Sequence, residues 1–219
     1  MQRKGEGRRR TLSSALGTPG VLRRFIILLA VATFAMFTLW AVVREVVDAP
    51  PGDYEVRQGD ILLGDGKFTK AIGRFEAALA VSPGHRGAMM GRAIALLESG
   101  RQDEAEAAFS NLITFLSGDM AADDATGTAV LAAAFANRGI LRDRSGRHEA
   151  ALSDYRRALA IDAGAVEGPG LFHRILYGNA KPSTIAKRAD YIEAQLALPE
   201  EQRLLRVPEA DARQRMHKP

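Results

Sequence analysis

Small and aromatic residues recur at a fixed spacing of 34 residues in the middle of this chain. The pairs that show the spacing are Gly66 and Gly100, Ala71 and Ala105, and Phe75 and Phe109. A third copy follows, but its glycine stands 46 residues after that of the second copy, which is the same period with a 12-residue insertion. A fixed period of this length indicates stacked repeats, each a supersecondary unit that buries its apolar face against the next.

Composition and local pattern favour helices for these repeats. Hydrophobic residues make up 47% of the 219 residues and aromatic residues only 6%, so most apolar side chains are the small and aliphatic ones that suit helix packing. In the first and third copies a small, an aromatic and a small residue stand at i, i+4 and i+7, on one face of a helix. A glycine precedes each set, where a left-handed turn would end an earlier helix. We therefore expect an all-α fold of helix pairs.

The joint pattern resembles the tetratricopeptide repeat, in which each repeat is a helix pair. The resemblance covers about residues 52–165 and implies an α-α superhelix of about three pairs, over 52–85, 86–119 and 132–165. The insertion between the last two is expected to be a loop, with Thr126 or Thr128 capping the next helix. The residues that the resemblance assigns to repeat packing are Gly59, Ala71, Phe75, Ala78, Pro83, Ala93, Ala105, Phe109, Gly139, Ala151, Tyr155 and Ala158.

A run of nineteen uncharged and mostly apolar residues lies at 25–43. A helix of this length is roughly 28 Å long, close to the ~30 Å hydrocarbon core of a bilayer. The apolar region of a cleaved signal peptide is shorter, and a core helix is rarely apolar on all sides. We interpret 25–43 as an uncleaved transmembrane signal anchor with Trp40 at the interface, between a basic tail (1–24) and a linker (44–51).

The charge distribution predicts an orientation and argues against nucleic-acid binding. The whole chain carries a net charge of +4, but residues 1–24 contain seven Lys and Arg against one Glu, which leaves −2 for the remainder. The positive-inside rule then places residues 1–24 in the cytoplasm and the repeats across the membrane. The simplest setting is a bacterial inner membrane with a periplasmic repeat domain. The folded part lacks the basic excess that nucleic acid requires.

No pattern of catalytic, cofactor-binding or metal-binding residues is found in the sequence. Cysteine is absent, which excludes disulfides and thiolate chemistry. The histidines are not at metal-ligand spacing, and Asp123-Asp124 has no partner acid, base or nucleophile nearby in sequence. We expect no enzyme activity, no cofactor, no metal and no small-molecule substrate.

The resemblance also implies a binding face, because first helices of this family line a concave surface. The corresponding residues are Val56, Asp60, Leu63, Met90, Ile94, Leu97, Ala136, Ile140 and Asp143. Most are apolar, so either this groove takes an apolar or helical protein segment, or the chain's own C-terminal region covers it. In the first case a charge at Met90 or Ile94 should abolish partner capture and leave the helical signal intact.

The C-terminal part is expected to close the array. Residues 166–198 would form a capping helical region, because the last repeat needs a polar-backed cover, and 199–219 a charged tail. The expected function is a protein-protein interaction scaffold, tethered to a membrane and facing the periplasm, that assists assembly or stability of an envelope protein complex. Its partners would be proteins in or at the membrane. The alternative is a structural subunit of a larger membrane enzyme or of a MoxR/von Willebrand A-type maturation system.

Overall fold

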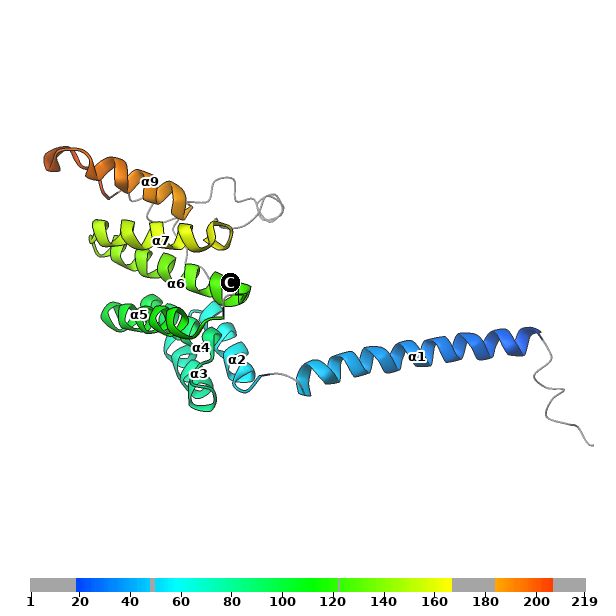
Figure 1. The fold of residues 1–219 in the computed structure, drawn as a ribbon. Coiled ribbons are helices and arrows are strands. Elements are labelled where there is room, and N and C mark those ends of the chain that lie inside the picture. Colours follow the sequence, from blue (N-terminus) through cyan, green and yellow to red (C-terminus); the bar gives the residue numbers. More distant parts are fainter. Residues whose placement is uncertain (1–18, 48–49, 122, 167–183, 207–219) are drawn as a thin grey trace, which may run out of the picture. The chain divides into compact units, whose positions relative to one another are not determined.

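The chain consists of helices and their connections wherever its structure is described. A computed structural model describes residues 19–47, 50–121, 123–166 and 184–206. Every regular element in these ranges is a helix (Figure 1), which confirms the all-α prediction. The chain divides after Pro50 into two units, which are described separately.

The described part of the first unit is one helix, α1 (Pro19–Val47), of 29 residues, followed by Pro50. Its segment Gly20–Ala41 has a mean hydropathy of 2.0 and is long and apolar enough to cross a membrane. The core helix of a soluble protein or a signal sequence near the N-terminus can meet the same criterion of length and composition. Near its end the Arg44 guanidinium lies 5.2 Å from the centroid of the Trp40 ring, a cation-π distance.

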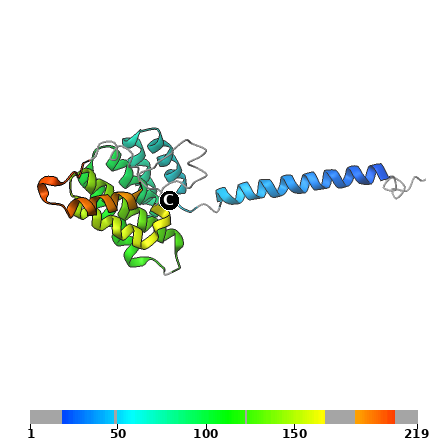
Figure 2. The same cartoon turned by 90° about the horizontal axis from the view of Figure 1, so that it is seen from above.

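In its described residues the second unit stacks three helix pairs and a further helix. The pairs are α2 (Asp53–Gly64) with α3 (Phe68–Val81), α4 (Arg86–Glu98) with α5 (Gln102–Asp119), and α6 (Ala125–Arg144) with α7 (His148–Val166). Each pair packs against the next, and α4 also contacts α2 and α6 (Figures 1 and 2). Helix α9 (Ile185–Leu196) packs on α7 and is followed by a short 3₁₀ helix, η2 (Glu200–Gln202). This order agrees with the predicted α-α superhelix of three pairs and a C-terminal cap.

A glycine with positive φ ends the turn between the helices of each pair. The φ angles are +72° at Gly66, +82° at Gly100 and +79° at Gly146. After Gly66, the amide of Lys67 donates back to the carbonyl of Leu62 at 2.8 Å, as in a Schellman turn. The repeated glycines therefore set the reversal that pairs the helices.

Aromatic rings fill the space between glycines of neighbouring helices. Phe75 on α3 is fully buried, and a Cβ added at Gly59 would lie 2.5 Å from its ring. A Cβ at Gly91 on the next pair would also collide with this ring. In the third pair Tyr155 packs in the same way against Gly139. All residues assigned to repeat packing are buried except Pro83, which is exposed in the turn before α4.

The third pair begins earlier than the resemblance implies. Helix α6 starts at Ala125 and not near residue 132, because Asp124 caps it: the amide of Gly127 donates to Asp124 Oδ1 at 2.7 Å. The expectation that Thr126 or Thr128 provides the cap is therefore wrong. Asp124 also pairs with Arg86 at 2.5 Å, so the cap is fixed to the start of α4.

The variant Gly59→Ala tests the ring-to-glycine packing. The added methyl group would push the Phe75 ring out of a filled space, so we expect a loss of about 1–3 kcal/mol of unfolding free energy. The control Gly73→Ala adds a methyl group at an exposed position of α3, where nothing lies within 4 Å, and should gain up to about 1 kcal/mol. Urea unfolding of the full chain in detergent micelles, followed by circular dichroism, measures both. Equal stability of the two variants would contradict this packing.

Candidate functional site

The predicted groove residues lie on successive inner helices, α2, α4 and α6. Val56, Asp60 and Leu63 belong to α2, Met90, Ile94 and Leu97 to α4, and Ala136, Ile140 and Asp143 to α6. The six on α4 and α6 are between 0 and 7% exposed, Val56 is 9% exposed, and only Asp60 and Leu63 are half-buried. The inner face is therefore not an open groove along its length.

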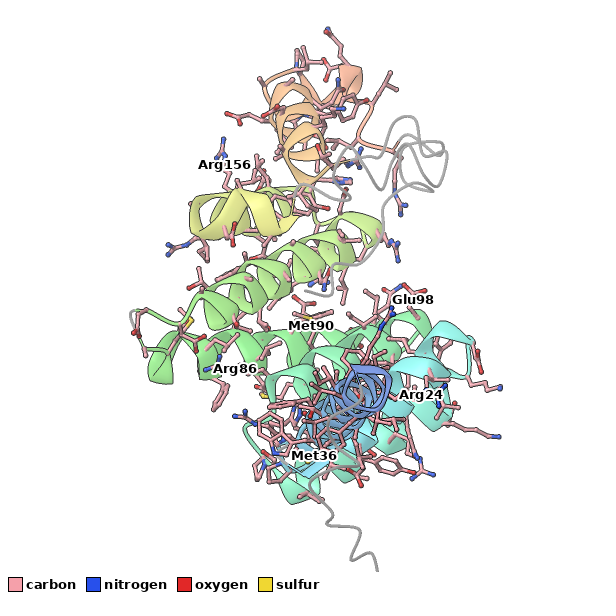
Figure 3. The ribbon with its side chains drawn as sticks, turned by 90° about the vertical axis from the view of Figure 1, so that its right-hand side faces the viewer. Arg24, Met36, Arg86, Met90, Glu98 and Arg156 are labelled. Atoms are coloured by element: carbon pink, nitrogen blue, oxygen red, sulfur yellow. The ribbon has the colours of Figure 1, made fainter. Side chains whose placement is uncertain are left out.

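Met90 shows why a charge on this face would not test binding alone. Its side chain is 1% exposed and lies between α4 and α6 (Figure 3). The buried Asn137 amide on α6 donates to its sulfur at 3.5 Å. A charge at Met90, or at Ile94, which is 5% exposed, would be buried without a partner and would cost several kcal/mol. The expectation that such variants keep the fold intact does not hold.

Asp143 is the centre of a buried polar cluster at the end of α6. Asp143 is 2% exposed and Arg188 of α9 is 4% exposed. The guanidinium donates to both carboxylate oxygens, Nε to Oδ2 at 2.7 Å and Nη2 to Oδ1 at 2.8 Å. The Tyr155 hydroxyl donates to Oδ2 at 3.2 Å, and His148 Nδ1 lies 3.1 Å from Oδ1. This bidentate pair fixes α9 to the third helix pair.

The stretch after η2 returns along α9 toward α6. Arg188 Nη2 donates to the carbonyl of Leu205 at 3.0 Å, and the Tyr191 hydroxyl donates to that of Leu204 at 2.6 Å. The Arg206 guanidinium then donates to the carbonyl of Arg144 at 2.7 Å. At the α6 end, the groove residue Asp143 and the carbonyl of Arg144 are thus bound by arginines of the chain's own C-terminal part.

A second polar network joins the second helix pair to the third. Arg138 Nε and Nη2 donate to the two Asp154 carboxylate oxygens at 2.9 and 2.8 Å, and Nη1 donates to Ser110 Oγ at 3.0 Å. Arg142 bridges Glu106 on α5 and Asp154 on α7, at 2.8 and 2.9 Å. The network spans α5, α6 and α7 and holds the third pair in place after the insertion.

The carboxylates of Glu106 and Asp124 are held in their ionised form by their hydrogen bonds and neighbouring arginines. Burial opposes ionisation of Glu106, but hydrogen bonds and charge from Arg147 and Arg142 outweigh it and keep its pKa below the ordinary value. The Gly127 amide and the Arg86 guanidinium likewise lower the pKa of Asp124. Carboxylates with a lowered pKa in the folded state stabilise it at neutral pH, and this contribution is lost in acid.

His85 caps the N-terminus of α4. His85 Nδ1 accepts from the amide of Ala88 at 3.3 Å, so Nε2 carries the hydrogen and donates to Asp53 Oδ1 at 2.7 Å. Both ring nitrogens are engaged, so this pair is a cap and not a catalytic dyad. Among the residues that the structure describes, no three His, Asp or Glu side chains are placed to hold a metal ion.

These features define a helix-pair repeat array closed at one end by a capping helix. Residues 56–121 match the family model described as "Tetratricopeptide repeat", which supports the resemblance over the first two pairs. A solved structure, the tetratricopeptide-repeat domain of Sgt2 from Aspergillus fumigatus, is 15% identical, with 69% of this chain and 87% of that chain covered and a TM-score of 0.46. No curated protein matches the chain.

Arg188 was not predicted from the sequence as part of any site, although it forms the buried ion pair with Asp143. It stands between Ile185 and Ile192 on the apolar side of α9, and all three are buried. An arginine on an otherwise apolar helix face is a readable signal, because such a charge needs a buried partner. Asp143, read from sequence as a groove residue, is that partner.

The variant Arg188→Met tests the buried cluster. It leaves the Asp143 carboxylate buried without its bidentate partner, which typically costs about 3–5 kcal/mol. We expect much faster amide hydrogen exchange in α9. The control Arg156→Met removes an α7-to-α9 pair with Glu193 whose side chains are each 57% exposed, and should cost less than about 1 kcal/mol. If the amides of α9 exchange at the wild-type rate in Arg188→Met, as they should in the control, Arg188 does not fix α9 to the third pair.

Acid should destabilise the array through the carboxylates with lowered pKa. Their stabilising contribution is complete above the ordinary glutamate pKa of 4.5 and declines as pH falls through the lower folded-state pKa. Urea unfolding at a series of pH values measures the decline. The variant Glu106→Gln should be less stable at neutral pH and should show a smaller decline, whereas Glu201→Gln, at an exposed position on η2, should behave as wild type. An unchanged decline in Glu106→Gln would contradict this account.

Proposed function

We propose that the chain is a non-enzymatic protein-protein interaction scaffold tethered to a membrane by α1. Its helix-pair array faces the periplasm of a bacterium and assists assembly or stability of an envelope protein complex. The observation that carries the proposal is a repeat array separated by only five residues, 48–52, from a helix with a 22-residue apolar segment.

The dimensions and flanks of α1 support the tether. Twenty-two residues span about 33 Å as a helix, enough for the ~30 Å hydrocarbon core. Basic residues dominate the chain before it, and Trp40 with Arg44 stands near its other end, where aromatic and cationic side chains meet headgroups. These flanks favour a cytoplasmic N-terminus and an array on the opposite side.

The tether explains how a modest array could find its partners. Confinement to the membrane plane raises the effective concentration of the array near other membrane proteins. The predicted inner face is proposed as a binding face at its α2 end, where Asp60 and Leu63 are half-buried. At the α6 end a partner would have to displace the contacts made by Arg188 and Arg206.

Membrane extraction and protease access test this proposal together. The full chain should resist extraction by alkaline carbonate, and protease should reach the array from the periplasmic side only. In the variant Phe34→Arg/Ala35→Arg two charges at mid-helix oppose insertion by about 5 kcal/mol or more, so this chain should be extracted, whereas the control Phe34→Leu should stay. Extraction of the wild type, or cleavage from the cytoplasmic side only, would contradict the proposal. Copurification in fixed stoichiometry after stringent detergent washing would favour an integral subunit of a larger enzyme.

A further inference from the structure

An extended segment of the chain lies along one side of α9. Residues 203–206, here called the strap, follow η2 and have no helical structure. Side chains of α9 contact the strap from Gln195, Tyr191 and Arg188. These residues are spaced four and three apart, so they lie on one face of the helix. The order of the contacts shows that the strap runs antiparallel to α9.

The α9 side chains bind the backbone of the strap. Gln195 Oε1 accepts from the Leu204 amide at 2.7 Å, and the Tyr191 hydroxyl donates to the Leu204 carbonyl at 2.6 Å. Arg188 Nη2 donates to the next carbonyl, that of Leu205, at 3.0 Å. The Leu204 side chain itself is 70% exposed. Hydrogen bonds to the backbone give affinity for an extended chain, and the side chains that enter pockets decide which sequence is preferred.

Two side chains of the strap can provide such a preference. Leu205 is half-buried and packs against the apolar cluster formed by α6, α7 and α9. The Arg206 guanidinium donates at 2.7 Å to the carbonyl of Arg144, the last residue of α6. Carbonyls at a helix end lack helical partners and favour a cation. The site therefore suits an aliphatic residue followed by a cationic one.

The strap does not fill this end of the array. An open hollow of about 390 Å³ lies beside Leu205. It is lined by Leu196 of α9 and by residues 146–150 at the start of α7. A segment with a larger apolar side chain than leucine could occupy this space, so the site is larger than its own occupant.

Helix α9 does not depend on the strap for its place. The buried pair of Arg188 with Asp143 fixes it to α6, and its apolar side packs through residues such as Ile185 and Ile192, which are 3% and 0% exposed. The strap is held less firmly, because Leu204 and Arg206 are exposed and only the two other strap residues are half-buried. The strap can therefore leave while the site that it occupies stays intact.

We propose that the strap is an internal competitor in a binding site on α9. The occupant that replaces it is an extended segment of a partner protein, with an aliphatic residue followed by a cationic one. This inference rests on the proposed scaffold function and names the site and the kind of segment that it takes.

The short connection makes the strap an effective competitor. Only residues 197–202 separate it from the end of α9, so its effective concentration at the site is high. A partner segment shifts the equilibrium only if it binds the open site better than the strap does. Filling the hollow beside Leu205 would give a segment that advantage. The strap thus excludes weak segments and admits a matching one.

A peptide added to the full chain in detergent micelles tests the site. The probe has the sequence of residues 200–206, an amidated C-terminus and a fluorescent label, and fluorescence anisotropy measures its binding. Leu205→Asp/Arg206→Ala removes both side-chain anchors of the strap and opens the site. This opened chain should bind the peptide about tenfold more tightly than the wild type or better, since a site that is open in about a tenth of the molecules loses that factor in apparent affinity.

Two further variants separate the site from a general effect of mutation. Leu204→Asp changes an exposed side chain of the strap, so it should keep the strap in place and bind the peptide as weakly as the wild type. Tyr191→Phe/Gln195→Leu, made in the opened chain, removes two backbone contacts and should weaken peptide binding about tenfold or more. All of these positions are exposed or half-buried, so circular dichroism should show unchanged helix content.

Hydrogen exchange in the wild-type chain gives a second measurement that needs no variant. The Leu204 amide donates to Gln195 while the strap is bound. Excess peptide should displace the strap and speed the exchange of this amide. Unchanged exchange at a peptide concentration that saturates the opened chain many times over would overturn the proposal.

The outcomes distinguish the strap from the scaffold. Tight binding by the opened chain that is lost in Tyr191→Phe/Gln195→Leu supports the site. Absent binding, equal binding by the wild type and the opened chain, or binding that survives the changes on α9 overturns it. The scaffold proposal is then untouched, because it is tested by extraction and protease access. A wild-type chain that alkaline carbonate extracts contradicts the tether and leaves the peptide result standing.

Discussion

The array depends on an aromatic ring that fits only because its neighbours are glycines. Phe75 contacts Gly59 within its own helix pair and Gly91 in the next pair. One side chain therefore sets both the spacing within a pair and the spacing between pairs. A methyl group on either glycine would collide with the ring, so the sequence has little freedom at these positions. The third pair repeats the arrangement with Tyr155 on Gly139, and the Tyr155 hydroxyl also reaches Asp143. Ring packing and the buried polar cluster are thus connected.

Repetition explains which parts of the fold were predictable. Glycine turns and small-aromatic-small triplets recur because each pair solves the same packing problem, so they are visible in the sequence, and the structure confirms the helix pairs that they predict. Features that occur only once in the array were not predicted from the sequence. The Asp124 cap moved the start of α6, and it depends on Arg86 of another pair. The sequence also left open whether the inner face is an open groove or is covered by the C-terminal region, and most of that face is buried. The clearest example is Asp143, whose partner Arg188 lies 45 residues further along the chain, a separation that no local pattern encodes.

Buried charge is concentrated where the period is broken. The insertion before the third pair removes the regular spacing there, and the Arg138 and Arg142 network with Asp154 and Glu106 joins the second and third pairs. Such networks require every partner, because a single removed partner leaves a buried charge uncompensated. They therefore restrict the third pair to one orientation more strictly than apolar packing does. The same argument applies to Arg188, which fixes the cap in one register on α6 and α7.

The two ends of the array differ in the side chains that they expose. At the C-terminal end, α9 buries the last apolar face and makes the array complete in that direction. At the other end, Tyr54 and Ile61 occupy positions that are fully buried alanines or leucine in the later pairs. Alanine allows a neighbouring helix to come close, whereas a tyrosine and an isoleucine project further from the helix and leave less room for one. The two ends of the array therefore present different faces, a polar outer side on α9 and two large exposed apolar side chains on α2.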